Sequence, residues 1–183
     1  MDSLVANIFP GLAGMPNLHP MVVHFPIALL TKFLILEILS LILKSESLKT
    51  GASWMLYAGT LGAFGAVLAG FRAAATLEHS DEIHAIIESH EHLGLVVLLI
   101  AVILSLWRIV FKRKLAGSWW IVYLALSIIM VIVMSFGADL GGLMVYTHGV
   151  GIKAEAKADP GAGGQSMPAN NSKTPHDSTP HKH

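Results

Sequence analysis

The chain has 183 residues, of which 54% are hydrophobic and only 13% are charged, whereas a soluble domain of this size carries about a quarter charged residues. Twelve basic residues balance twelve acidic ones, so no overall field favours binding to nucleic acid. The absence of cysteine excludes disulfides, iron–sulfur clusters and thiolate-bound zinc, and it leaves histidine as the strong nitrogen ligand.

Four apolar runs predict an all-α integral membrane protein, a bundle of four transmembrane helices. Each run is long enough, at about 1.5 Å per residue, to cross about 30 Å of hydrocarbon. The predicted spans are about 20–43, 52–76, 90–111 and 119–147. They form a domain over 19–150, which follows an outer leader, 1–18, and precedes a polar tail, 151–183, whose composition predicts disorder unless a partner orders it.

Charge in the connections predicts an orientation with both termini outside. Basic residues lie between the first two runs and at or after the end of the third: Lys44, Lys49, Arg108, Lys112, Arg113 and Lys114. Because such residues concentrate on the cytoplasmic side, these two connections are predicted to be cytoplasmic. The leader, an acidic loop over Glu78–Glu91 and the tail then lie outside. This topology predicts a multi-pass protein of the bacterial inner membrane.

Histidines are the candidate ligands, and the predicted topology brings seven of them to the outer, periplasmic face: His19, His24, His79, His84, His90, His92 and His148. For each histidine alone, a residue at the membrane interface is the simpler interpretation. For the group, convergence at one membrane depth indicates a site, because polar side chains at that depth are costly.

The geometry of the predicted helices reduces the number of histidines that could bind one ligand. His90 and Gly94 share one helix face, whereas His92 projects to nearly the opposite face, so His90 is preferred and His92 is held in reserve. At the start of the first run, Asn17 is a possible helix cap. Pro26 predicts a distortion near Val22 that redirects the neighbouring His24.

The fourth and second runs carry small residues that leave room for a flat ring. Gly137, Gly141 and His148 share a stripe in the fourth run, which predicts a groove leading to the histidine. In the second run Gly62 belongs to a smooth Gly/Ala face, for which ordinary helix packing is the better interpretation. No strict internal repeat is visible.

Charged residues inside the runs are few, and among them are Lys32, Glu37, Arg72 and Asp139. Arg72 and Asp139 are predicted at similar depths, where they could form an ion pair, or Arg72 could hold a haem propionate. Lys32 and Glu37 lie deeper, where they could line a polar cavity or pair across the bundle.

Three features together resemble one bacterial membrane family, domain of unknown function 2231: the opening HPMVVHFPIAL (His19–Leu29), the His90-to-Gly94 spacing, and the closing GGLMVYTHGV (Gly141–Val150). The similarity covers about Asn17 to Val150. It implies four transmembrane helices with outward-facing histidines, and an association with respiratory or small b-type cytochrome-like subunits, but no settled reaction.

The favoured hypothesis is a b-type haem electron-transfer subunit, with one or two haems, acting between quinol and a periplasmic c-type cytochrome within a larger complex. The predicted haem-binding residues are His19, His24, His90, His148, Gly62, Gly94, Gly137, Gly141 and Arg72. The first alternative is zinc or copper bound by three or four imidazoles, drawn from His19, His24, His90, His92 and His148. The second is a structural or assembly subunit whose histidines are interfacial.

Overall fold

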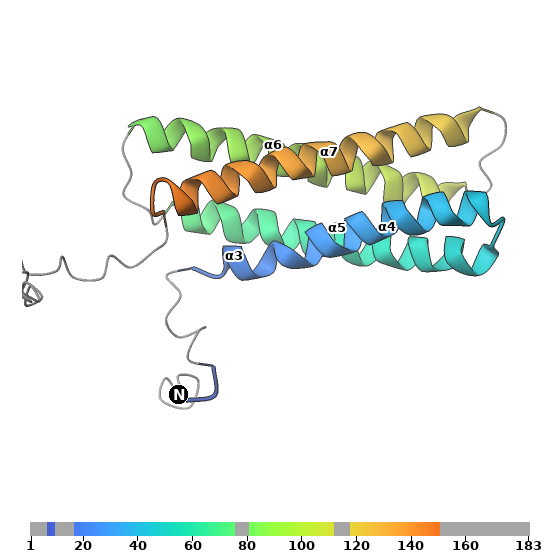
Figure 1. Ribbon diagram of the computed structural model, residues 1–183, viewed down its shortest axis with the longest axis horizontal. Coiled ribbons are helices and arrows are strands. Elements are labelled where there is room, and N and C mark those ends of the chain that lie inside the picture. Colours follow the sequence, from blue (N-terminus) through green and yellow to red (C-terminus); the bar gives the residue numbers. More distant parts are fainter. Residues whose placement is uncertain (1–6, 10–16, 76–80, 112–117, 151–183) are drawn as a thin grey trace, which may run out of the picture. The chain divides into compact units, whose positions relative to one another are not determined.

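A computed structural model describes residues 7–9, 17–75, 81–111 and 118–150, and its helices lie within the unit Met1–Lys153. The elements in chain order are α3 (His19–Val22), α4 (His24–Ile42), α5 (Glu46–Ala74), α6 (Asp81–Val110) and α7 (Trp119–Tyr146) (Figure 1). The described residues contain no strand. Most of the predicted leader, His79 and the predicted tail, 151–183, lie outside the described residues.

Four helical segments are long and apolar enough to cross a membrane: His19–Ile42, Glu46–Ala74, Ile83–Val110 and Trp119–Tyr146. The prediction of an all-α bundle with four membrane-spanning helices is therefore confirmed. Helices α4 and α6 each pack against both α5 and α7, and they lie diagonally across the bundle from one another. Successive helices run in opposite directions, so α4 and α6 begin at the same end of the bundle (Figure 1).

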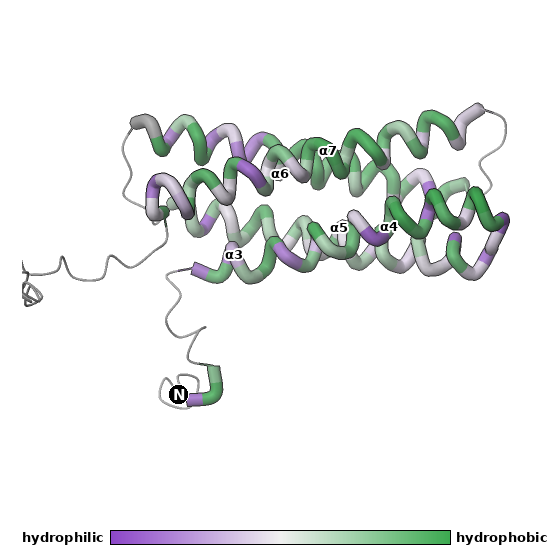
Figure 2. The backbone as a smooth tube through the Cα atoms, in the orientation of Figure 1, coloured by the Kyte–Doolittle hydropathy of each residue, from purple (hydrophilic) through white to green (hydrophobic). Residues whose placement is uncertain are grey.

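The surface of the bundle is apolar and part of its interior is polar, as expected for helices surrounded by lipid. Large aliphatic side chains face outward, among them Leu61, Ile42 and Val110. Figure 2 shows hydrophobic residues over most of each helix. The interior holds Leu30, Phe33, Leu56 and Leu104 together with the buried polar residues Glu37, Ser127 and Arg108.

Two helices begin earlier than the hydropathy predicted. Helix α5 begins at Glu46, where the Ser45 hydroxyl accepts a hydrogen bond from the Leu48 amide at 3.4 Å. Helix α6 begins at Asp81, so the predicted loop over Glu78–Glu91 is wrong from Asp81 onward. The reason is that hydropathy marks where a helix enters lipid, whereas capping and backbone bonding decide where the helix begins.

The first membrane span is broken near its start, as Pro26 predicted. Helix α3 ends at Val22 and α4 begins at His24, with a turn at Val23 between them. Proline has no amide hydrogen and clashes with the carbonyl four residues back, which here belongs to Val22. The Asn17 side chain accepts a hydrogen bond from the His19 amide at 3.2 Å, but the N-cap residue of α3 is Leu18 rather than the predicted Asn17.

Candidate functional site

Two histidines from distant parts of the chain face one another near the end of the bundle where α3 and α6 begin. His19 is the first residue of α3, and His90 lies within α6. Their ring centres are 5.8 Å apart and their planes make an angle of 88°. Both side chains are half-buried. We call these two residues the histidine pair.

Each ring of the histidine pair is held by a backbone carbonyl of a neighbouring helix. His19 Nδ1 lies 2.9 Å from the Ala66 oxygen on α5, and His90 Nδ1 lies 2.8 Å from the Gly137 oxygen on α7. A carbonyl only accepts, so both Nδ1 atoms carry the hydrogen and donate it. A neutral imidazole then keeps the lone pair on Nε2, which is how protein histidines that ligate metals are commonly oriented.

Each ring lies against a glycine of the neighbouring helix, and we call these two residues, Gly70 and Gly141, the glycine seats. A Cβ atom added to Gly70 would lie 3.1 Å from His19 Cε1, and one added to Gly141 would lie 3.4 Å from His90 Cε1. On α7 the flat ring that lies against Gly141 is the imidazole of His90, whereas the predicted groove was to lead to His148.

The other predicted glycines lie at contacts between helices. A Cβ on Gly62 would meet the Pro26 ring at 3.3 Å, one on Gly137 would meet Leu93 at 3.7 Å, and one on Gly94 would meet Val67 at 4.0 Å. Gly62 thus allows α4 to approach α5 closely, which is the packing role that the small-residue face indicated. The Gly137 contact brings α6 close enough for His90 to reach the Gly137 carbonyl.

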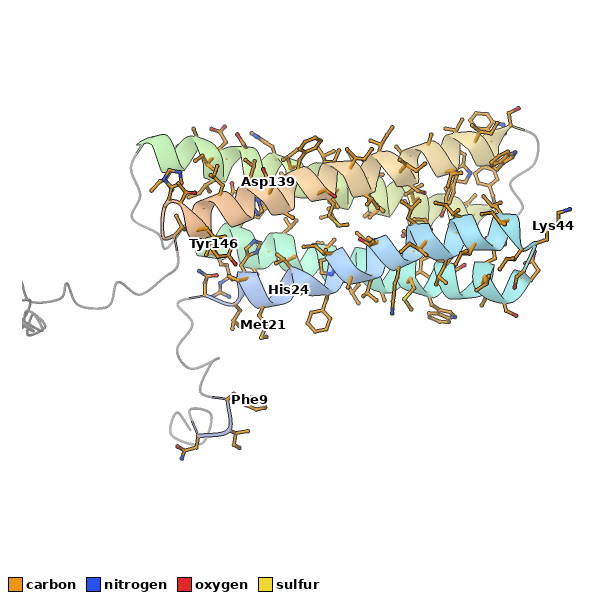
Figure 3. All side chains as sticks on the ribbon, viewed as in Figure 1. Phe9, Met21, His24, Lys44, Asp139 and Tyr146 are labelled. Carbon is orange, nitrogen blue, oxygen red and sulfur yellow. The ribbon has the colours of Figure 1, made fainter. Side chains whose placement is uncertain are left out.

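The remaining predicted ligands lie apart from the histidine pair. His24 is exposed on α4 (Figure 3), His92 is exposed on α6, and His148 is half-buried just beyond α7. Among the described residues, no hydrogen bond or ring contact joins any of the three to His19 or His90. The structure thus brings together two of the predicted histidines.

Arg72 and Asp139 do not form the ion pair that their depth suggested. Both side chains are exposed, and no salt bridge joins them. The prediction failed because equal depth does not specify which way two helices turn their side chains.

The buried ion pair is instead formed by Glu37 of α4 and Arg108 of α6. Arg108 Nη1 donates to Glu37 Oε2 at 2.7 Å, and the two residues are only 3% and 4% exposed. Glu37 was predicted to pair across the bundle, but Arg108 was missed because it was counted as a residue of the cytoplasmic connection. The signal that could have identified Arg108 is its spacing from a histidine. Arg108 lies 18 residues after His90, and Glu37 lies 18 residues after His19.

Arg108 also binds two further groups near the other end of the bundle. Its Nη1 donates to the Tyr123 hydroxyl at 3.1 Å, and its Nη2 donates to the Lys49 carbonyl at 3.1 Å. The guanidinium lies 5.7 Å from the centre of the Tyr123 ring. These contacts give hydrogen-bond partners to most N–H groups of the Arg108 guanidinium, whose positive charge would otherwise be costly to bury.

The described residues contain no group of three or more His, Cys, Asp or Glu side chains that could hold a metal ion. The imidazole set predicted for zinc or copper is therefore not seen in this part of the chain. What the structure brings together is a pair of imidazoles, each with a free Nε2.

Comparison with known proteins places most of the chain in one family. A family model described as a predicted membrane protein, DUF2231, matches residues 15–154. No curated protein and no solved structure matches the chain.

Proposed function

Because this chain belongs to DUF2231, a family of predicted membrane proteins, we propose its function from the site itself: the histidine pair holds one b-type haem in a membrane electron-transfer subunit. The observation that carries this proposal is the distance between the two imidazoles, together with the hydrogen bonds that free both Nε2 atoms.

The spacing of the histidine pair would allow His19 and His90 to hold one metal ion between them. A metal–imidazole bond is about 2 Å long, and the ring centre lies about 1 Å behind the ligating nitrogen, so two imidazoles that share one ion would have ring centres up to about 6 Å apart. The observed distance is 5.8 Å.

The number of ligands favours haem over a bare metal ion. Zinc sites use three or four protein ligands in tetrahedral geometry, and the described residues contain no such group. In a b-type haem the porphyrin supplies four nitrogens, so two histidines complete the coordination. The family match and the absence of cysteine ligands are compatible with this choice.

The chain's own residues orient the ligands. The carbonyls of Ala66 and Gly137 hold the rings in one tautomer and one direction, and such outer partners raise ligand basicity. Bound haem supplies one-electron transfer. Because the site lies near one end of the bundle, electrons are exchanged at one membrane face. We infer quinol and a c-type cytochrome of a larger complex as the partners, with this face on the periplasmic side of the inner membrane.

The absorption spectrum of the purified full chain tests this proposal. We expect a Soret band and sharp reduced α-bands, with one haem per chain. His19→Ala and His90→Ala should each lower haem affinity by more than the about 10–100-fold that loss of an outer-shell partner costs.

His24→Ala and His92→Ala are the matched controls, because both histidines are exposed and lie outside the pair; they should retain full haem content. His148→Ala should retain it as well. A protein that stays colourless when reconstituted with haemin would refute the proposal. Stoichiometric zinc or copper in such a protein, lost in His148→Ala, would favour the bare-metal alternative.

A further inference from the structure

The bundle consists of two hairpins whose structures correspond when the numbering is shifted by 71 residues. The first hairpin is 19–74 (α3, α4 and α5) and the second is 81–146 (α6 and α7). In each hairpin a histidine bonds the carbonyl 47 residues later. In each, a glycine four residues beyond that carbonyl, Gly70 or Gly141, seats the ring.

The buried positions correspond under the same shift. All five buried residues of α7 lie 71 residues after a buried residue of α5: Tyr123 after Ala52, Ser127 after Leu56, Met130 after Gly59, Met134 after Ala63, and Gly137 after Ala66. In the other two helices, Leu30 and Phe33 correspond to Ala101 and Leu104, and all four are 0% exposed. The repeat is thus present in the burial pattern although it is not visible in the sequence.

Large and small side chains change places between the two hairpins, so the repeat is not visible when residue identities are compared. In the first hairpin Gly59 lies against Leu30. The corresponding residues of the second hairpin are Met130 and Ala101, both fully buried, so the large residue is on the other helix. An exchange of this kind keeps a large and a small residue in contact while residue identity is lost.

The shift also relates Glu37 to Arg108, which are 71 residues apart and in contact. Helices α4 and α6 are diagonal in the bundle, and long side chains at corresponding positions of these helices reach one another across its interior. His19 and His90 meet there in the same way. A hairpin paired with its own copy would instead place Glu37 against Glu37, or Arg108 against Arg108.

Two buried like charges in contact are strongly unfavourable because the surroundings have a low dielectric constant. We propose that the Glu37–Arg108 ion pair selects the pairing of the first hairpin with the second, and rejects the pairing of either hairpin with its copy in another chain. The Arg108 bond to the Lys49 carbonyl adds a second link from the second hairpin to the first. This role is independent of any bound cofactor.

A disulfide reporter can measure which hairpins pair. The chain contains no cysteine, and the hydroxyls of Thr60 on α5 and Ser105 on α6 are 2.9 Å apart. Thr60→Cys with Ser105→Cys should therefore form a disulfide within one chain, which links the two hairpins in a monomer on a non-reducing gel. The additional change Glu37→Arg should reduce this crosslink at least about tenfold, the effect of about 1.4 kcal/mol. Arg108→Glu added to Glu37→Arg should restore it.

Glu46→Arg is the matched control for charge reversal, because Glu46 is a glutamate of the same hairpin whose side chain is 81% exposed. It should leave the crosslink within the chain intact. The proposal would be overturned if the exchange of both charges, Glu37→Arg together with Arg108→Glu, failed to restore the crosslink.

Complementation between two chains gives the decisive result. One chain carries Glu37→Arg and Thr60→Cys, and the other carries Arg108→Glu and Ser105→Cys. When they are co-expressed, opposite charges meet only if hairpins pair between chains, so disulfide-linked heterodimers should form at least about tenfold more than with the same cysteines and natural charges. No excess of heterodimer would show that the ion pair stabilises the bundle without selecting its partners.

Discussion

At the scale of single residues, the two glycine seats explain how a helix can present a carbonyl to a histidine. A helical carbonyl already accepts a bond from the amide four residues later. The oxygen has a second lone pair, but the side chain four residues later tends to cover it. Gly70 follows Ala66 and Gly141 follows Gly137 at this spacing, so each ring reaches its oxygen.

Adding a methyl group at either seat should disturb the histidine pair. Gly70→Ala should have the larger effect, because its Cβ would lie 3.1 Å from the His19 ring, whereas Gly141→Ala places its Cβ 3.4 Å from the His90 ring. Neither ring can withdraw and still bond its carbonyl. We expect lower haem affinity in both variants, with the greater loss in Gly70→Ala, by titration with haemin.

Gly142→Ala is the control for this pair, since its Cβ would meet only Tyr146 at 4.0 Å. It should bind haem like the parent protein. Equal affinity in all three variants would contradict the seating role of these glycines.

At the scale of elements, Pro26 interrupts the helical hydrogen bonding between α3, which begins at His19, and α4. Val23 keeps helical backbone angles (φ −62°, ψ −25°), and its amide bonds the His19 carbonyl at 3.1 Å, so the interruption is local and comes from the amide hydrogen that Pro26 lacks. In the second hairpin α6 runs through the corresponding region without a break. The two hairpins therefore bring their histidines to the same place by different local backbones.

Pro26→Ala should join α3 and α4 into one hydrogen-bonded helix and so shift His19 relative to the Ala66 carbonyl. Alanine restores the amide hydrogen that bonds the Val22 carbonyl. We expect the low-spin haem spectrum to weaken while the helical circular dichroism stays the same. The chain offers Pro20→Ala as a control, because Pro20 is exposed in the first turn of α3, where proline breaks no helical bond. An unchanged spectrum in Pro26→Ala would show that the break does not orient His19.

At the scale of the whole bundle, the two ends differ in charge. Lys44 lies at the end opposite to Tyr146 (Figure 3), and Lys49 is near it in the first turn of α5. Arg108 no longer counts toward this positive end because it is buried in an ion pair. The acidic residues Glu88 and Glu91 lie near the histidine pair in α6. By the positive-inside rule the Lys44 end should be cytoplasmic.

Single cysteines test this orientation without background, because the chain has none of its own. Ser89→Cys lies on an exposed position near the histidine pair, and Glu46→Cys lies at the Lys44 end. In intact cells an impermeant maleimide with access to the periplasm should label Ser89→Cys and spare Glu46→Cys. Permeabilised cells should label both. The reverse pattern would place the histidine pair on the cytoplasmic side.

Much of the fold could be predicted from hydropathy, and less of the site. The four spans follow from the lengths of the apolar runs, and the break before α4 follows from Pro26. His19 and His90 were among the predicted ligands, but so were His24 and His148, which lie apart from the pair. Arg72 and Asp139 were predicted to pair because they lie at similar depths, but no salt bridge joins them. Arg108, the buried partner of Glu37, was not predicted.

Sequence alone determined the number of spans and their approximate bounds, and it limited the candidate ligands to histidine, because these depend on local composition and on rise per residue. Only the tertiary structure decided that His19 meets His90 and that Glu37 meets Arg108. The physical reason is that the rotation of each helix about its own axis is set by packing between distant segments, through contacts such as Gly62 with Pro26 and Gly137 with Leu93. No periodicity within a single helix contains that information.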